Sequence, residues 1–297
     1  MTKAPIRSVA LLLAMLASPL AATPAAITTD QRPDAAQPAA MDAVRIPSGD
    51  AAMNAIVYTP GGPGPYPALI LFHGFPGNEQ NLDLAQAARR AGFVVLTLHY
   101  RGSWGSPGNF SLAGVVEDGS AALAWLEAPA ALARYHIDPR RIVLAGHSMG
   151  GFVASRTAAA HPETRGLLLI DAWNIGASTL KSLQAPGGRE QFRTARAGDV
   201  LPLAGTGTDA LADEILAAGE RFDLKRDAAR LADRPFFAIG AARANGREMD
   251  AIAGAVRAAG GKQVTSLILP SDHGFNDHRI ALIAASLDWL EQFKAQR

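Results

Sequence analysis

The segment from Arg141 to Gly151 constrains the fold most, because it places a serine between glycines directly after an apolar run and before a helical pattern. Strand, tight turn and helix in this order around G-x-S-x-G hold a serine in a strained backbone with its hydroxyl exposed. Gly146 and Gly150 have no side chains, which lets the strand and the helix approach closely. The start of the helix adds unpaired N–H groups and a partial positive charge that favour an oxyanion. We therefore predict that Ser148 is a nucleophile.

The rest of the chain alternates short apolar runs with longer helical patterns, which is typical of βαβ units around a mostly parallel sheet. Strands are predicted at Ala55–Tyr58, Ala68–His73, Phe93–His99, Arg141–Ala145, Gly166–Ile170, Pro235–Ile239 and Val264–Leu269. Apolar spacing of three and four predicts helices at Asn81–Ala91, Leu112–Glu127, Met149–Ala160, Arg247–Ala259 and Arg279–Phe293. The first pair of strands, before the glycines and prolines of 61–65, is predicted to form an antiparallel edge. The fold class is therefore α/β, with helices on both faces of the sheet.

The N-terminal residues resemble a secretory signal peptide. Residues 1–26 contain no acid, carry Lys3 and Arg7, and continue through an apolar run to small residues. The apolar run, from Val9 to Leu20, is shorter than the ~20 residues of a spanning helix. We therefore expect export to the periplasm or the medium, with no stable membrane insertion after the signal peptide is removed. A flexible leader is predicted at 27–40 and one domain at 41–297.

One segment, 172–233, interrupts the alternation. It is a long connection between two predicted strands, broken by glycines and prolines, with a helical run at Ala210–Arg221. A connection of this length without its own strands is more typical of a functional insert than of a simple loop. We predict a small helical cap inserted above the sheet.

The composition narrows the classes of function. The chain has no cysteine, which excludes a disulfide framework, a thiol nucleophile and a cysteine-ligated metal. Its 28 basic and 27 acidic residues give a net charge of +1, so no basic surplus favours nucleic acid as a partner. A small-molecule substrate is the expected partner.

Several motifs resemble the α/β-hydrolase family, and within it the catalytic domains of prolyl-oligopeptidase-like peptidases and dienelactone-hydrolase-like esterases. They are His73-Gly74-Phe75-Pro76-Gly77, Tyr100-Arg101-Gly102-Ser103-Trp104-Gly105, Asp138-Pro139-Arg140-Arg141, the serine turn, and Asp272-His273-Gly274-Phe275. The similarity runs from about Ala51 to Gln292. It implies an α/β-hydrolase fold and acyl-transfer chemistry.

The resemblance also implies roles for residues near these motifs. His273, in a loop after the last predicted strand, is the expected general base. The backbone N–H groups of Phe75 and Met149 are the expected oxyanion donors. His73 and His147 are expected to pack. Asp272-His273 and Asp277-His278 superficially suggest metal ligands, but no third histidine pattern accompanies them, so we expect no metal and no other cofactor.

The carboxylate that should orient the base is missing from its usual place. Most relatives carry it after the strand that is predicted here at Pro235–Ile239, yet residues 240–245 contain no acid. Asp171, which follows the earlier strand Gly166–Ile170, is the best substitute, because some relatives place their acid there. The order Ser148, Asp171, His273 stays that of Ser…Asp…His.

Other assignments stay open. Asp171 has an equal alternative role as a helix N-cap or as a salt-bridge partner of the cap. Glu248 and Asp250 are lesser candidates for the acid, and Asn245 could orient the imidazole without supplying charge.

We expect an exported serine hydrolase that cleaves an ester, as a carboxylesterase does. The chain has no room for the propeller that restricts oligopeptidase substrates, which favours an ester over a peptide bond. One alternative is a small serine peptidase of prolyl-oligopeptidase type that takes a short peptide. The other is a non-catalytic binding protein, which the missing acid at 240–245 suggests.

Overall fold

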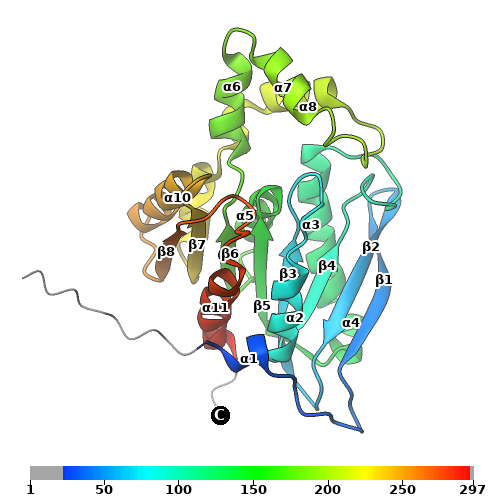
Figure 1. Ribbon diagram of the computed structural model, residues 1–297. Coiled ribbons are helices and arrows are strands. Elements are labelled where there is room, and N and C mark those ends of the chain that lie inside the picture. Colours follow the sequence, from blue (N-terminus) through cyan, green and yellow to red (C-terminus); the bar gives the residue numbers. More distant parts are fainter. Residues whose placement is uncertain (1–22, 295–297) are drawn as a thin grey trace, which may run out of the picture.

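The computed structural model describes residues 23–294 and builds them around one eight-stranded sheet with the order β1-β2-β4-β3-β5-β6-β7-β8 (Figure 1). The strands are β1 (Ala40–Ser48), β2 (Ala51–Thr59), β3 (Tyr66–Phe72), β4 (Val94–Leu98), β5 (Ile137–His147), β6 (Gly166–Ile170), β7 (Phe236–Ala241) and β8 (Val264–Leu269). β2 pairs antiparallel with both β1 and β4, and every pair from β4 to β8 is parallel. The predicted mostly parallel sheet with an antiparallel edge is confirmed.

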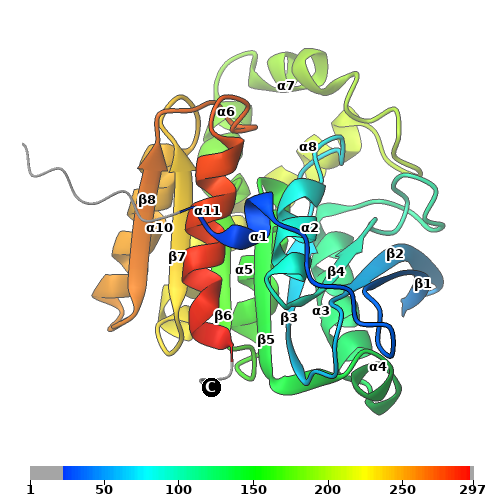
Figure 2. The ribbon, with the colours of Figure 1, turned by 60° about the horizontal axis from the view of Figure 1, so that its bottom comes forward.

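Helices cover both faces of the sheet. α2 (Leu82–Arg90) and α11 (Arg279–Leu290) lie on one face, and α3 (Leu112–Glu127), α5 (Met149–Ala160) and α10 (Gly246–Ala258) lie on the other (Figure 2). The short elements α1 (Ala25–Thr28), α4 (Pro129–Arg134) and η4 (Glu291–Phe293) complete the layers. The apolar stripes predicted from the sequence are the faces that these helices turn toward the sheet.

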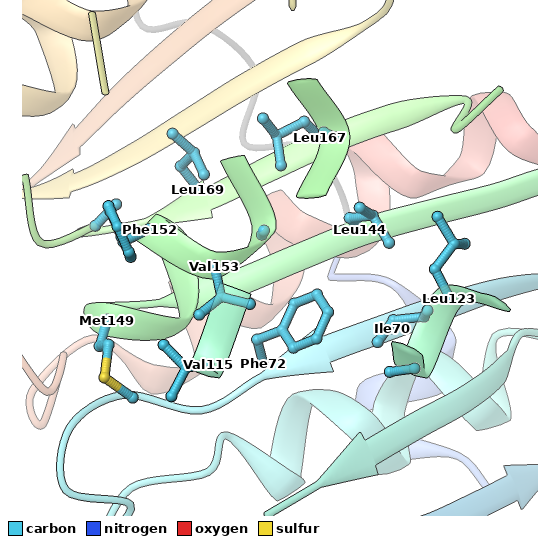
Figure 3. Packing of buried hydrophobic residues seen from close by; sticks show 14 of the residues in the cluster. Ile70, Phe72, Val115, Leu123, Leu144, Met149, Phe152, Val153, Leu167 and Leu169 are labelled. Carbon is cyan, nitrogen blue, oxygen red and sulfur yellow. The ribbon is translucent and has the colours of Figure 1, made fainter. Parts of the chain in front are cut away.

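A large part of the core lies where β3 and β5 meet α3 and α5. Figure 3 shows Ile70 and Phe72 of β3 beside Leu144 of β5, with Leu123 of α3 and Val153 of α5 packed over them. Every residue of β3 and β4 is buried, because helices cover both faces of these strands. β1 lies at the edge, and alternate residues of it are exposed instead. This rigid centre holds the serine turn at the end of β5.

The segment between β6 and β7 forms a cap over the carboxyl ends of the strands, at the top of Figure 1. It contains η1 (Ile175–Thr179), α6 (Leu180–Gln184), α7 (Gly188–Arg196), α8 (Thr208–Ala218), η2 (Gly219–Phe222), η3 (Leu224–Asp227) and α9 (Ala228–Leu231). Glu214 of α8 accepts hydrogen bonds from the N–H groups of Leu112 and Ala113 (2.8 and 2.6 Å), and so ties the cap to the start of α3. The insert is therefore attached to the sheet domain through α8 as well as at its ends.

The signal peptide predicted at 1–26 lies largely outside the described residues. At the boundary between that segment and the predicted leader, Ala26 and Ile27 pack against the helical layer of α2 and α11, and Arg90 Nε donates to Ala26 O (2.6 Å). Between residues 23 and 294, no helix has the length and apolarity that crossing a membrane requires.

Candidate active site

Ser148 lies in the turn between β5 and α5, with a positive φ of 56°. A side chain on Gly146 would overlap the carbonyl oxygen of Gly150, and one on Gly150 would overlap that of Phe72. Ser148 N–H donates to Ile170 O at the end of β6 (3.0 Å), which fixes the turn to the neighbouring strand. A non-glycine residue at this φ is strained, and the surrounding contacts hold it there.

Asp171 directly follows β6 and is fully buried. Its Oδ2 lies 2.6 Å from Nδ1 of His273, in the loop after β8. The alternative role as a helix N-cap does not fit this position, because Asn174 precedes the helical turn η1. The structure thus brings together the two residues that the sequence had suggested as base and acid.

The loop that lacks the expected acid wraps around the Asp171 carboxylate. Ala241 N–H donates to Asp171 Oδ1 (2.8 Å), and Asn245 N–H lies 3.2 and 3.3 Å from the two carboxylate oxygens. Asn245 Nδ2 donates to the backbone oxygen of Asp171 (3.0 Å). Asn245 therefore holds the acid and makes no hydrogen bond to His273.

The lesser candidates for the acid lie elsewhere. Glu248 accepts from Asn174 Nδ2 (2.6 Å) and from Lys225 Nζ (3.2 Å), so it fastens the cap to α10. Asp250 is exposed on α10. Within the described part of the chain, neither carboxylate pairs with His273.

His147 does more than pack. Its Nε2 lies 2.8 Å from the backbone oxygen of His273, so Nε2 carries the proton and donates to that carbonyl. The two imidazole rings lie 4.7 Å apart between centroids. Burial, followed by the charge of His273 nearby, lowers the pKa of His147 to about 4. His147 is therefore a neutral residue that supports the His273 loop.

The expected oxyanion donors flank Ser148. Met149 begins α5, and the loop that carries Phe75 passes so close that a Cβ on Gly74 would lie 2.9 Å from Ser148 Cβ. Among the hydrogen bonds of residues 23–294, none uses the backbone N–H of Phe75 or Met149 as donor. Both groups are thus free to donate to a ligand atom beside Ser148.

His73 supports the loop that carries Phe75. Its Nδ1 donates to Gly74 O (2.7 Å), and Tyr100 Oη donates to the His73 carbonyl (3.0 Å). Burial lowers the pKa of His73 to about 4. His73 is therefore a neutral packing residue in the structure.

A cavity of about 370 Å³ connects these groups to the cap. Ser148, His273 and Phe75 line it from the sheet domain, and the cap contributes Thr179 and Arg196. The His273 side chain is 43% exposed, so a ligand in the cavity can reach it. No hydrogen bond joins the side chains of Ser148 and His273 among the described residues, as is common in unliganded sites of this kind.

A second cavity, of about 340 Å³, lies over β1, β2 and β4. None of the predicted site residues lines it. Of these two cavities, the one under the cap contains Ser148 and the paired His273.

The residues that superficially suggested a metal site have other partners. Asp277 binds Arg243 (2.8 Å) and Ser271, and Asp272 binds Asn276 (2.8 and 2.9 Å). Over residues 23–294, no group of three or more His, Asp or Glu side chains is arranged to hold a metal ion.

Sequence comparison identifies the family of the fold. A model described as "Alpha/beta hydrolase family" matches residues 69–296. Two uncharacterized proteins, from two strains of Mycobacterium tuberculosis, are each 36% identical over 106 residues, or 35% of this chain and 35% of theirs. The matched segment therefore spans about a third of the length of these curated relatives.

Solved structures share the architecture. The 2,6-dihydroxy-pseudo-oxynicotine hydrolase superposes with a TM-score of 0.63 at 17% identity, covering 87% of this chain and 68% of that one. EstE1, a carboxylesterase cloned from a metagenomic library, gives 0.57 at 21% (87% and 91%). The Pyrococcus horikoshii acylaminoacyl peptidase gives 0.61 at 16% (85% and 41%). At these identities the likeness shows the fold alone.

Proposed function

This chain belongs to the α/β-hydrolase family, and we propose that it is an exported serine hydrolase that cleaves small esters by acyl transfer. The observation that carries the proposal is the 2.6 Å contact between Asp171 Oδ2 and His273 Nδ1, in one site with Ser148. A buried carboxylate at Nδ1 leaves Nε2 of His273 unprotonated and ready to accept the serine proton. An acid site left vacant would have favoured the binding protein instead.

In the proposed reaction, Ser148 Oγ attacks the ester carbonyl carbon and its proton passes to His273 Nε2. Asp171 stabilises the imidazolium, and the N–H groups of Met149 and Phe75 donate to the oxyanion of the tetrahedral intermediate. The C–O bond then breaks, and His273 returns the proton to the departing alkoxide. Water then attacks the acyl carbon and gives a proton to His273. The bond to Ser148 Oγ breaks, the carboxylic acid leaves, and His273 returns the proton to Ser148.

The shape of the site favours an ester over a long peptide. A cavity of about 370 Å³ under the cap accommodates a small molecule. The cap is fastened to α3 through Glu214, which limits how far it opens for a polypeptide. An alkoxide also leaves with less assistance than an amine.

Hydrolysis of p-nitrophenyl butyrate by the purified protein tests the proposal, with Ser148→Ala as the matched control. We expect turnover that Ser148→Ala abolishes, and covalent labelling of wild type alone by a fluorophosphonate. Turnover of aminoacyl p-nitroanilides in preference to esters would identify a peptidase. Equal rates for wild type and Ser148→Ala on both substrate types, with no labelling, would leave a binding protein.

Export is proposed from residues 1–26, with their basic start, apolar run and small-residue end. Mass spectrometry of the protein expressed in a Gram-negative bacterium tests it. The expected result is a periplasmic or secreted chain that begins near Ala26. An intact chain from Met1 in the cytoplasm would contradict export.

A further inference from the structure

We infer that Arg196 makes this site selective for esters that carry a second, ionised carboxylate in the acyl or leaving group. The inference rests on the proposed function, since it assigns the substrate class of the same site. Arg196, at the end of α7, lines the cavity that also contains Ser148 and His273. No Asp or Glu is among the described residues that line this cavity, although Asp199, outside it, pairs with Arg196.

Trp173 fixes Arg196 relative to the nucleophile. Its backbone N–H donates to Ser148 O (2.9 Å), and its indole Nε1 donates to Thr179 Oγ1 (2.7 Å). The guanidinium carbon of Arg196 lies 5.7 Å from the centroid of the Trp173 ring, within the range of a cation–π contact. One residue thus connects the backbone of the reacting serine to the position of the cation in the cap.

The guanidinium has two donors to spare on one edge. Nη1 of Arg196 donates to Asp199 Oδ2 (3.0 Å), whereas Nε and Nη2 have no partner among the described residues. Nε–H and Nη2–H point in parallel, which matches the two oxygens of a carboxylate. The Arg196 side chain is 40% exposed and lines the cavity, so a ligand there can contact the guanidinium.

Asp199 orients the guanidinium and also offsets part of its charge. The expected selectivity therefore depends on the paired hydrogen bonds more than on the long-range field of the cation. Lysine at this position would keep the charge and lose the fork, so it serves as a test of that distinction.

Thr179 adds a further donor on the same wall. Its Oγ1 accepts from Trp173 Nε1, and the hydroxyl proton is not used by another described residue. The neighbouring hydroxyls of Ser178 and Ser182 donate to the backbone oxygens of Asn174 and Ser178 (3.0 and 3.1 Å). The cavity therefore offers an anionic ligand one free hydroxyl donor as well as the guanidinium.

The experiment compares mono-p-nitrophenyl adipate with its methyl ester, which has one more methyl group and no charge. Their kcat/KM values are measured at pH 7.5 for wild type, Arg196→Gln, Arg196→Lys and Arg193→Gln, after subtraction of spontaneous hydrolysis. Arg193 is the matched control, because it lies on the same helix, is 48% exposed and pairs with Glu190 and Asp209 outside the cavity.

We expect the ratio of anionic to neutral kcat/KM to fall about tenfold in Arg196→Gln, the effect of losing a charge-assisted hydrogen-bonded pair. The ratio should fall less in Arg196→Lys and stay at the wild-type value in Arg193→Gln. An unchanged ratio in Arg196→Gln, with Ser148-dependent turnover of the neutral ester intact, overturns this inference and leaves the proposed function standing. An equal fall in Arg193→Gln would assign the effect to the general charge of α7 and overturn the role of Arg196. No Ser148-dependent turnover of either ester overturns both proposals.

Discussion

The carboxylate of Asp171, at the end of β6, accepts a hydrogen bond from the N–H of Ala241, at the end of β7 (2.8 Å). The two strands are neighbours and parallel, so their carboxyl ends meet at one edge of the sheet. An acid on either strand can therefore reach the same histidine. This adjacency explains how a chain with no carboxylate at 240–245 still supplies one to His273.

The Asp171–His273 pair gives the first prediction. Asp171→Asn keeps the size of the side chain and removes its charge, so His273 loses both its tautomer and the partner of its imidazolium. We expect kcat to fall ~10⁴-fold, measured with p-nitrophenyl butyrate. Asp250→Asn is the control, since Asp250 is exposed on α10, and it should keep the wild-type rate. Loss of activity in Asp250→Asn with Asp171→Asn active would exclude Asp171 as the acid.

The hydrogen bond from His147 to the His273 carbonyl gives the second prediction. His147→Phe fills much of the same space and removes the donor, which leaves the loop of His273 less firmly placed. We expect kcat/KM to fall about tenfold, in line with the ~1–3 kcal/mol cost of an unmet buried hydrogen bond. His136→Asn, at an exposed position outside the cavity, should leave it unchanged. A wild-type kcat/KM in His147→Phe would show that this hydrogen bond does not matter for the reaction.

Acid should destabilise the fold through its buried histidines. Burial lowers the pKa of both His73 and His147 from the usual 6.5 to about 4. Between pH 6.5 and 4 the unfolded chain binds protons that the folded chain does not, so the free energy of unfolding falls as the pH falls through this range. Each histidine contributes about 1.4 kcal/mol per pH unit there, or about 3 kcal/mol in full.

Urea denaturation at pH 7.5, 5.5 and 4.5 measures this loss. Above pH 6.5 both histidines are neutral in the folded and the unfolded chain, so they should add almost no pH dependence to the free energy of unfolding. In His147→Phe the slope between pH 5.5 and 4.5 should decrease by the share of one histidine. A free energy of unfolding that is constant from pH 7.5 to 4.5 would contradict neutral burial of both rings.

The close approach of β3, β5 and α5 gives the fourth prediction. Gly150→Ala places a methyl group against the carbonyl oxygen of Phe72, so either the helix or the strand must shift. We expect a loss of about 1–3 kcal/mol in the free energy of unfolding and loss of fluorophosphonate labelling at Ser148. Gly254→Ala is the matched control, because a Cβ on Gly254, within α10, meets no atom within 4 Å. It should be neutral or stabilise by about 0.5–1 kcal/mol, and equal losses in both variants would argue against a special constraint at the turn.

Much of the fold could be predicted because apolar periodicity is a local property of the sequence. The bounds predicted for the helices at 112–127 and 149–160 and for the strands at 166–170 and 264–269 are those observed. β5 starts earlier than expected, at Ile137, because Ile137 pairs with Tyr66 before an irregularity in the register of β3 and β5. The polar residues between Ile137 and Ile142 interrupt the apolar run, so the sequence did not indicate this longer strand. The helix α7 was not predicted, because Phe192 is its one large apolar residue and Gly188 its one buried residue, so no apolar stripe marks it.

The candidate site likewise contains residues that local sequence indicates and residues that only distant contacts bring together. Ser148 and His273 follow from local motifs, and Asp171 from its place after a strand in chain order. The roles of His147 and Arg196 depend on how distant segments meet. His147 reaches a carbonyl 126 residues away, and Arg196 depends on the position of the cap above Trp173. No pattern of spacing in one chain encodes either contact.

With the acid on β6, the loop after β7 serves the base mainly through its backbone. The N–H groups of Ala241 and Asn245 hold the carboxylate whatever side chains accompany most of the loop. Ala244 lines the cavity and donates none of those bonds. We therefore expect that larger or polar residues at position 244 would reshape the cavity wall without moving the carboxylate beside His273. Under the proposed function, the loop that would otherwise hold the acid becomes a place where selectivity can be changed separately from catalysis.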